Sequence, residues 1–279
     1  GHKDQIGPYG TCAAVLFNQI ANPGTAIAND VVAQVVRFWD DPLENRKLQA
    51  QNVRLAFLVL SLAGISDNEI ARVRQSAIDT LLQRQHPEGA WGDWVAGDQK
   101  GSPRQETTAW VLLALHRCNH SAKAVQQAQE YLLKRVGPAQ SGSTISEFAM
   151  AVLLATLDKG RAPKKLMTLA KSSLKRFDEE ESERIQFFDY YEEADGNNPI
   201  SPRRDYLCYP AVLPYALLTF GITKHSGPTG YLGAARARIA LGKQIERMIQ
   251  SGSYYVLPGA VRAATVDQAV VAMAYEFLK

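Results

Sequence analysis

Charged side chains recur at the start of the apolar helical segments of this sequence, and arginine is the most frequent of them. Guanidinium groups bind carboxylates and phosphates through paired, charge-assisted hydrogen bonds. If these starts converge in the folded chain, they form an arginine-lined pocket for an anionic ligand such as a diphosphate, a nucleotide or a peptide carboxylate. The alternative is structural, with the same charges paired between neighbouring helices. The residues of this predicted pocket are Arg54, Arg104, Glu106, Glu147, Arg203, Arg204, Asp205, Arg262 and Asp267.

Arg54 stands inside an apolar segment, NVRLAFLVLSLAGI. An unpaired guanidinium among apolar side chains is costly. We therefore expect Arg54 to be paired, either with Glu106 or with a bound ligand.

The segments that position these charges are helices of two kinds. Six are apolar, and most of these are apolar nearly all round, which is typical of helices buried on every side: 9–20, 52–65, 107–118, 145–158, 205–222 and 266–279. Between them, more polar helices carry a single apolar stripe: 30–39, 68–85, 122–136, 164–177 and 234–249. Strand signals are limited to two short stretches, 185–191 and 253–257. The sequence therefore predicts an all-α fold.

Two arrangements suit these helices, an open solenoid or a ring with the buried helices inside and the amphipathic helices outside. A solenoid of so few repeats exposes its apolar helices on one side, which their continuous apolarity disfavours. We therefore expect one domain over residues 1–279, a single α/α toroid of about six helical pairs.

Two irregular stretches interrupt this pattern. The segment 178–202 is the longest connection, with an acidic run followed by aromatic residues; we expect a solvated loop, and a lid over the site is the alternative. Pro210 and Pro214 fall within an apolar segment, where each removes a backbone donor and favours a kink.

The connection after residue 84 contains Gln85, Gly89 and Trp91 in the spacing Q-x-x-x-G-x-W. A glutamine that ends a helix can bond to the backbone of the turn, glycine permits a positive φ, and tryptophan covers the last helical turn. This spacing resembles the QW repeat motif of the terpene cyclase and protein prenyltransferase β-subunit superfamily, whose prenyltransferase and squalene oxidase repeats build an α/α toroid. The resemblance rests on this one complete copy of the motif.

The resemblance implies two chemistries, of which the first is alkene or epoxide protonation. Class II terpene cyclases perform it with an aspartic acid of a D-x-D-D motif, kept protonated by its neighbours. The sequence has no D-x-D-D. Asp40 and Asp41 come closest, but Pro42 follows them at the expected end of an outer helix.

The second implied chemistry is zinc-dependent prenyl transfer, in which the family binds zinc with an aspartate, a nearby cysteine and a later histidine. Asp205 and Cys208 stand one residue further apart than the family's D-x-C, and the only later histidine, His225, is expected in a loop. A catalytic zinc site needs three well-aimed protein ligands. We therefore expect neither a metal nor another cofactor.

Composition limits the other classes. The chain has 279 residues, a formal net charge of +3 and no basic run interleaved with aromatic residues, which argues against nucleic-acid binding. No apolar run is long enough to span a bilayer. The three cysteines lie among apolar neighbours without the spacing of a disulfide framework, which favours the reducing cytoplasm.

Three functions remain. We expect a non-catalytic sensor or scaffold domain on a toroid, because the catalytic motifs of the family are missing. We expect it to belong to a longer, bacterial-type polypeptide, because the chain ends inside an apolar segment at Lys279. Its partner would be a protein or a small anionic or isoprenoid ligand. The first alternative is an isoprenoid-handling enzyme, whose available acids are Asp205, Asp267 and Glu106. The second is a glycan-active α/α barrel, in which paired carboxylates act as acid and base.

Overall fold

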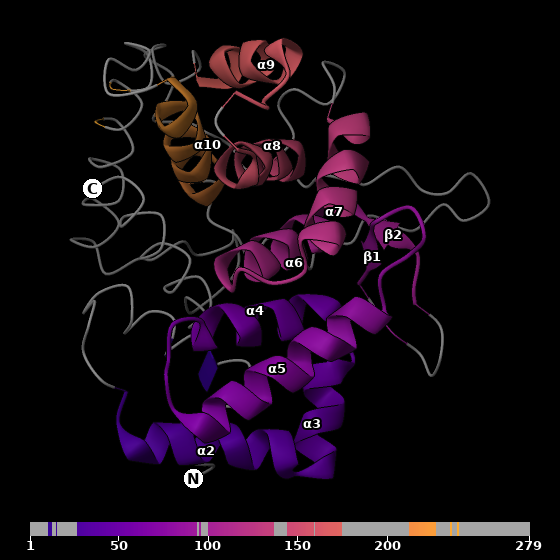
Figure 1. The fold of residues 1–279 in the computed structure, drawn as a ribbon, viewed down its shortest axis with the longest axis vertical. Coiled ribbons are helices and arrows are strands. Elements are labelled where there is room, and N and C mark those ends of the chain that lie inside the picture. Colours follow the sequence, from indigo (N-terminus) through magenta and orange to yellow (C-terminus); the bar gives the residue numbers. More distant parts are fainter. Residues whose placement is uncertain are drawn as a thin grey trace, which may run out of the picture. The chain divides into compact units, whose positions relative to one another are not determined.

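The computed structural model describes residues 11, 12, 15, 27–93, 95, 100–136, 144–158, 160–174, 212–226, 235 and 239. The chain divides into two compact units, Gly1–Tyr131 and Leu132–Lys279. The described residues are 74% helical with two short strands, so the predicted all-α class is confirmed (Figure 1).

From residue 27 onward, the described part of the first unit has four helices, a short ribbon of two strands and two more helices. In chain order these are α2 (Asn29–Asp40), α3 (Pro42–Gln49), α4 (Asn52–Leu62), α5 (Asn68–Gln83), β1 (Trp91–Gly92), β2 (Pro103–Arg104), α6 (Gln105–Arg117) and most of α7 (Ala122–Arg135). The strands are antiparallel, with Trp91 opposite Arg104 and Gly92 opposite Pro103. The predicted helices at 30–39, 52–65, 68–85, 107–118 and 122–136 are confirmed, with small shifts at their ends.

The core of this unit is formed by α4 and α6, which lie side by side (Figure 1). Every residue of 55–62 is at most 5% exposed, as expected for a helix that is apolar on all sides. Halfway along both helices, the rings of Phe57 and Trp110 pack at a tilt of 45°, with centroids 4.7 Å apart. Near their ends, the Cys118 thiol approaches the Val59 carbonyl oxygen at 4.0 Å. These matched contacts show that α4 and α6 run in the same direction.

The amphipathic helix α5 packs against α4 on one side and contacts α2 on another. Its buried residues follow the predicted helical stripe: Ile70, Val73, Ala77, Ile78 and Leu81. Asp67 begins the helix by accepting the Ile70 backbone N–H at 3.0 Å. A buried helix, an amphipathic return and a second parallel buried helix therefore form one repeat in α4, α5 and α6.

Helix α3 was not predicted from the sequence. Asp41 caps it by accepting the backbone N–H groups of Leu43 and Glu44 at 2.8 and 3.1 Å. Pro42 is the first helical residue, where its missing N–H needs no acceptor. Only Leu48 of this helix is buried, so apolar periodicity could not reveal it, whereas the start signal Asp-Pro-x-Glu does. Asp40 is thus the last residue of α2, and Asp41 is the single residue between α2 and α3.

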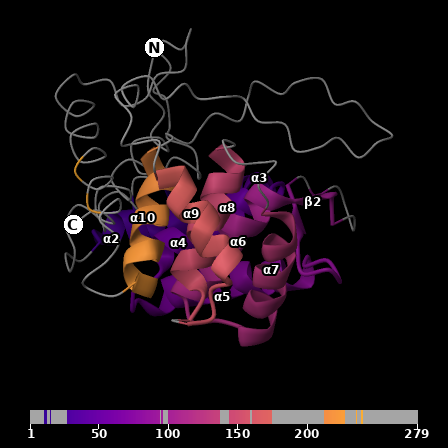
Figure 2. The ribbon, with the colours of Figure 1, turned by 90° about the horizontal axis from the view of Figure 1, so that it is seen from above.

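The described part of the second unit contains the end of α7 and the helices α8 (Thr144–Thr156), α9 (Lys164–Leu174) and α10 (Val212–Ser226). Helices α8, α9 and α10 contact one another (Figure 2). A Cβ added to Gly221 of α10 would lie 2.3 Å from Leu154 Cβ, so α8 and α10 meet where a side chain is missing. Lys224 Nζ donates to the Ala155 carbonyl at 3.0 Å, and His225 Nε2 donates to the Leu154 carbonyl at 2.7 Å. His225 therefore lies in a helix, not in the predicted loop, and binds the end of α8.

Pro214 lies within α10, two residues after Val212, from which the helix is described. Pro210 and Ala211 lie outside the described residues, so a kink at the two prolines stays a prediction.

Several predicted features lie outside the described residues: most of 9–20, the loop 178–202 and both strand candidates, 205–211, the helix 266–279, and all of 234–249 except 235 and 239. Closure into a single ring therefore stays a prediction. None of the helices in the described ranges has both the length and the apolarity of a bilayer-spanning segment.

Candidate functional site

The starts of α4 and α6 lie at the same end of the first unit, as the predicted pocket requires of these two helices. The Asn52 backbone N–H donates to the Asp93 carbonyl at 3.1 Å, and the Asn52 side-chain amide donates to the Gly92 carbonyl at 2.7 Å. Gly92 faces Pro103 in the strand pair, and the chain enters α6 directly after Arg104. Arg54, in the first turn of α4, is thereby brought to the same end as the residues that begin α6.

The prediction that Arg54 pairs with Glu106 was wrong, and the alternative of a bound ligand stays a prediction. The Arg54 guanidinium Nη1 donates to the Lys47 carbonyl at 2.8 Å, at the end of α3, and not to Glu106. Arg104 and Glu106 are both partly exposed at the start of α6. Glu147 is 2% exposed in the first turn of α8, which belongs to the second unit.

The remaining predicted site residues lie outside the described ranges: Arg203, Arg204, Asp205, Cys208, Arg262 and Asp267. The described residues contain no group of three or more His, Cys, Asp or Glu side chains that could hold a metal ion.

The turn 85–91 has the local geometry expected of its glutamine, glycine and tryptophan. Gln85 Nε2 donates to the carbonyls of Gly89 and Ala124, each at 3.1 Å. Gly89 has a φ of 92°, and a Cβ added there would lie 2.3 Å from the Gln127 carbonyl oxygen. Trp91 is fully buried, and its Nε1 donates at 2.6 Å to the carbonyl of Leu81. This turn is therefore a packed joint that holds α5 against α7 and the strand pair.

An open groove of about 680 Å³ lies beside the start of α4. Its walls come from the end of α2, from α3, from the residue after α5 and from the segment that follows β1. We call it the Arg84 groove; it is lined by Trp39, Asp40, Pro42, Asn45, Arg46, Gln49, Ala50, Arg84 and Val95. Small-molecule sites typically occupy about 300–1,000 Å³.

Arg84 is the half-buried cation of this groove. Its Nη1 donates to the Gln49 carbonyl at 2.8 Å and to Asn52 Oδ1 at 3.2 Å, and its Nη2 donates to Gln49 Oε1 at 3.4 Å. All these acceptors are neutral. Burial lowers the pKa of Arg84 from its ordinary value, with no opposing contribution from a carboxylate. The groove therefore contains a positive charge that none of the described acidic side chains neutralises.

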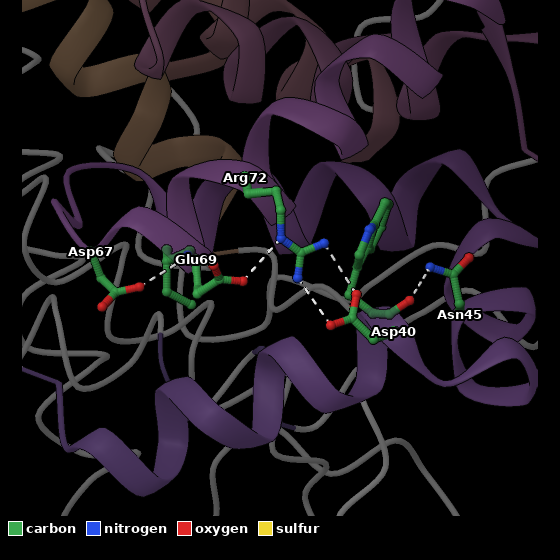
Figure 3. A network of polar contacts seen from close by, with 7 residues as sticks. Asp40, Asn45, Asp67, Glu69 and Arg72 are labelled. Carbon is green, nitrogen blue, oxygen red and sulfur yellow. Dashed lines mark hydrogen bonds and ion pairs between the residues drawn. The ribbon is translucent and has the colours of Figure 1, made fainter.

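The other charges of the groove are Arg46 and Asp40. Arg46 is exposed and makes no hydrogen bond or ion pair with another described residue. Arg72, just outside the groove, binds both carboxylate oxygens of Asp40 at 3.1 and 2.9 Å, and its Nε donates to Glu69 at 3.0 Å. Figure 3 shows the Arg72 guanidinium between the two acids. The hydrogen bonds to Asp40 and then to Glu69 raise the pKa of Arg72.

Amides connect the two ends of the groove wall. Asn45 Nδ2 donates to the Trp39 carbonyl at 2.5 Å (Figure 3). The Gln49 side-chain amide in turn donates to Asn45 Oδ1. This chain of bonds ties the last turn of α2 to the last turn of α3, so the groove has a built wall on that side.

Neither Arg46 nor Arg84 is among the site residues predicted from the sequence. Arg84 is the residue before Gln85, at the end of a recognised helix, and nothing in its spacing distinguishes it from a solvated arginine. Arg46 lies in α3, which periodicity missed. The usable signal was the helix start at Asp41-Pro42, which would have placed Arg46 on a helix directly before the buried α4.

No protein-family model matches the chain, and no curated protein matches it. The resemblance to the terpene cyclase and prenyltransferase superfamily therefore rests on Gln85, Gly89, Trp91 and the alternation of buried and amphipathic helices.

Proposed function

We propose that this chain is a non-catalytic recognition domain that binds an anionic ligand at the end where its buried helices begin. One observation carries the proposal: α4 and α6 start beside the same strand pair, which places Arg54, Arg84 and Arg104 at one end of the first unit. Collecting arginines at one end creates a positive surface, and guanidinium groups bind phosphates and carboxylates with charge-assisted hydrogen bonds.

We propose a ring of such helical pairs as the scaffold. The parallel α4 and α6 with α5 between them in sequence are the repeat unit that an α/α toroid requires, and the turn 85–91 supplies the joint that the resemblance leads us to expect. Continued around a ring, the same repeat would bring the starts of all buried helices to one mouth.

The non-catalytic character follows from the sequence, which lacks D-x-D-D and spaces Asp205 and Cys208 differently from the zinc-binding family. The isoprenoid-handling enzyme needs Asp205, Asp267 or Glu106 as its acid, and the glycan-active barrel needs two opposed carboxylates. Of these three acids only Glu106 lies within the described residues.

Two measurements on the full chain test this function. Native mass spectrometry before and after denaturation, with a metal analysis of the same sample, identifies any anion or protein that co-purifies. Titration calorimetry with geranyl diphosphate then measures binding, and chromatography of the recovered ligand measures turnover. We expect reversible binding with the ligand unchanged, and weaker binding by Arg54→Gln and Arg104→Gln. Consumption of the diphosphate would show an enzyme instead, and binding that neither substitution alters would move the site elsewhere.

A further inference from the structure

We infer that the Arg84 groove is a binding site for an organic oxyanion, a carboxylate or phosphate joined to an apolar body. The inference deepens the proposed function, on which it rests, by locating one anion site and naming the class of its ligand. It is carried by the groove itself, by the bonds that Arg84 makes, and by the charges and apolar side chains around it.

Arg84 uses only some of its N–H donors within the described residues. A guanidinium has five N–H donors in a planar fork. Both Nη1 donors are engaged by the Gln49 carbonyl and by Asn52, and one Nη2 donor reaches the Gln49 side chain. The Nε donor and the second Nη2 donor have no acceptor among the described residues. The atoms Nε and Nη2 lie on one edge of the guanidinium, and this edge can accommodate two oxygens of a carboxylate or phosphate side by side.

Arg74 is another arginine of this unit that donates to two backbone groups, and it provides a comparison for Arg84. Arg74 donates to the Leu62 and Ile65 carbonyls at 2.6 and 3.0 Å, where α4 ends. Arg74 does not line the groove. Both side chains satisfy backbone carbonyls at helix ends, which explains their structural role. Only Arg84 also contributes to a cavity of ligand size.

The charged side chains that line the groove have an excess of positive charge. Two arginines and one aspartate line the groove, and the aspartate is already bound through both oxygens by Arg72. No carboxylate of the described residues therefore compensates the positive charge of Arg46 and Arg84. A half-buried guanidinium gains more than an exposed one from an anion that replaces lost hydration. The chemistry of the groove thus selects a negative group.

The apolar lining and the volume of the groove indicate what the anionic group of the ligand is attached to. Trp39, Pro42, Ala50 and Val95 give the groove apolar lining beside its two cations. The volume exceeds what a single inorganic anion fills, and apolar walls favour a ligand that buries carbon next to its charge. A ring or short chain attached to the oxyanion satisfies both requirements.

The experiment titrates the full, ¹⁵N-labelled chain with phenyl phosphate and with benzoate, following the tryptophan indole N–H signals by NMR. The chain has four tryptophans. Trp39 lines the groove, whereas Trp91 and Trp110 are fully buried; Trp39→Phe assigns the reporting signal. Benzamide is the neutral control, and inorganic phosphate and acetate lack the apolar body.

We expect phenyl phosphate, benzoate or both to shift the Trp39 signal to saturation, benzamide to leave it unchanged, and the small anions to bind more weakly. The tighter of the two probes identifies phosphate or carboxylate as the preferred group. Arg84→Gln should raise Kd about tenfold or more, the loss expected for hydrogen bonds from a charged donor. Arg46→Gln should raise it about two- to fivefold, because its charge is exposed.

Matched variants keep the result interpretable. Arg74→Gln removes a carbonyl-bound arginine outside the groove and should leave Kd unchanged. Arg46 makes no bond with the described residues, so Arg46→Gln tests the site even if Arg84→Gln unfolds the chain. Binding that is insensitive to Arg46→Gln and Arg84→Gln but weakened by Arg54→Gln or Arg104→Gln would refute the groove and leave the proposed function intact. No binding of any oxyanion would refute both. Turnover of geranyl diphosphate, with phenyl phosphate binding still lost in Arg84→Gln, would refute only the non-catalytic function.

Discussion

Gln85 of the turn 85–91 directly follows Arg84 of the Arg84 groove in the sequence. The two regions differ in how many of their polar groups are hydrogen-bonded within the chain. In the turn, Gln85 and the Trp91 indole donate only to backbone carbonyls, and the ring of Trp91 is fully buried. In the groove, Arg84 retains donors without acceptors in the described residues, and Arg46 lies exposed beside it. Buried polar groups are normally paired because an unmade hydrogen bond is costly. Gln85 and Trp91 follow this rule as parts of a structural joint, whereas the half-buried Arg84 lines an open groove and leaves donors for a ligand.

The comparison also separates shape from charge. A side chain has no room at Gly89, whereas about 680 Å³ is open at the groove. Substitutions in the turn should therefore change the free energy of unfolding, and substitutions in the groove should mainly change anion binding. The following predictions test that division.

Trp91→Ala should have the largest effect. It removes a fully buried ring and its hydrogen bond to Leu81, and such truncations cost about 3–5 kcal/mol. Urea denaturation measures the free energy of unfolding. Trp91→Phe keeps a ring but loses the indole donor, so it should cost clearly less. Equal losses for both variants would show that the hydrogen bond, and not packing, holds the joint.

Gly89→Ala should rank second. A non-glycine residue at positive φ costs about 1–3 kcal/mol, and here the new methyl group would also meet the Gln127 backbone. Gly64→Ala is the matched control, because Gly64 has a φ of 82° with nothing within 4 Å of the added Cβ. The difference between the two variants isolates the contact with α7. If they are equally destabilised, the close approach at Gly89 is not a constraint.

Arg84→Gln and Arg74→Gln should destabilise the chain by similar amounts. Each removes a charged donor from two or more acceptors at helix ends, a loss of about 1–3 kcal/mol. They should differ when phenyl phosphate is added, because a ligand stabilises only the protein that binds it. With phenyl phosphate, the midpoint temperature of thermal unfolding should rise for the parent chain and for Arg74→Gln, but not for Arg84→Gln. A shift in all three would place the anion away from Arg84.

Asp41→Ala should give the smallest change. The loss of an N-terminal cap costs about 0.5–2 kcal/mol, and here it would loosen α3, which supplies one wall of the groove. Asp67→Ala removes the corresponding cap from α5 at a similar cost. Only Asp41→Ala should weaken the binding of phenyl phosphate. Equal Kd values for the two variants would show that the groove does not depend on the start of α3.

The helices and the turn that were predicted correctly depend on interactions between residues close in the sequence, whereas the partner of Arg54 depends on how the helices pack. The buried α4 and α6 were predicted because the middle of each segment is apolar on nearly every side, and α5 because its apolar residues recur at helical spacing. The conformation at Gly89 was predicted because a turn between two helices restricts its own backbone. The partner of Arg54 was not, since a guanidinium binds whichever acceptor the fold brings near, and the fold brings the Lys47 carbonyl.

The groove shows what the tertiary structure alone decided. Arg84 contacts Gln49 and Asn52, which are 35 and 32 positions away in the chain. Arg46 joins it only because a helix without an apolar stripe begins at Pro42 and leads into the start of α4. The sequence by itself determined the helices and the joint between them, because apolar spacing and local backbone preferences act over a few residues. The position of the unneutralised charges depended on how those helices pack, since hydrogen-bond partners are chosen by distance in space.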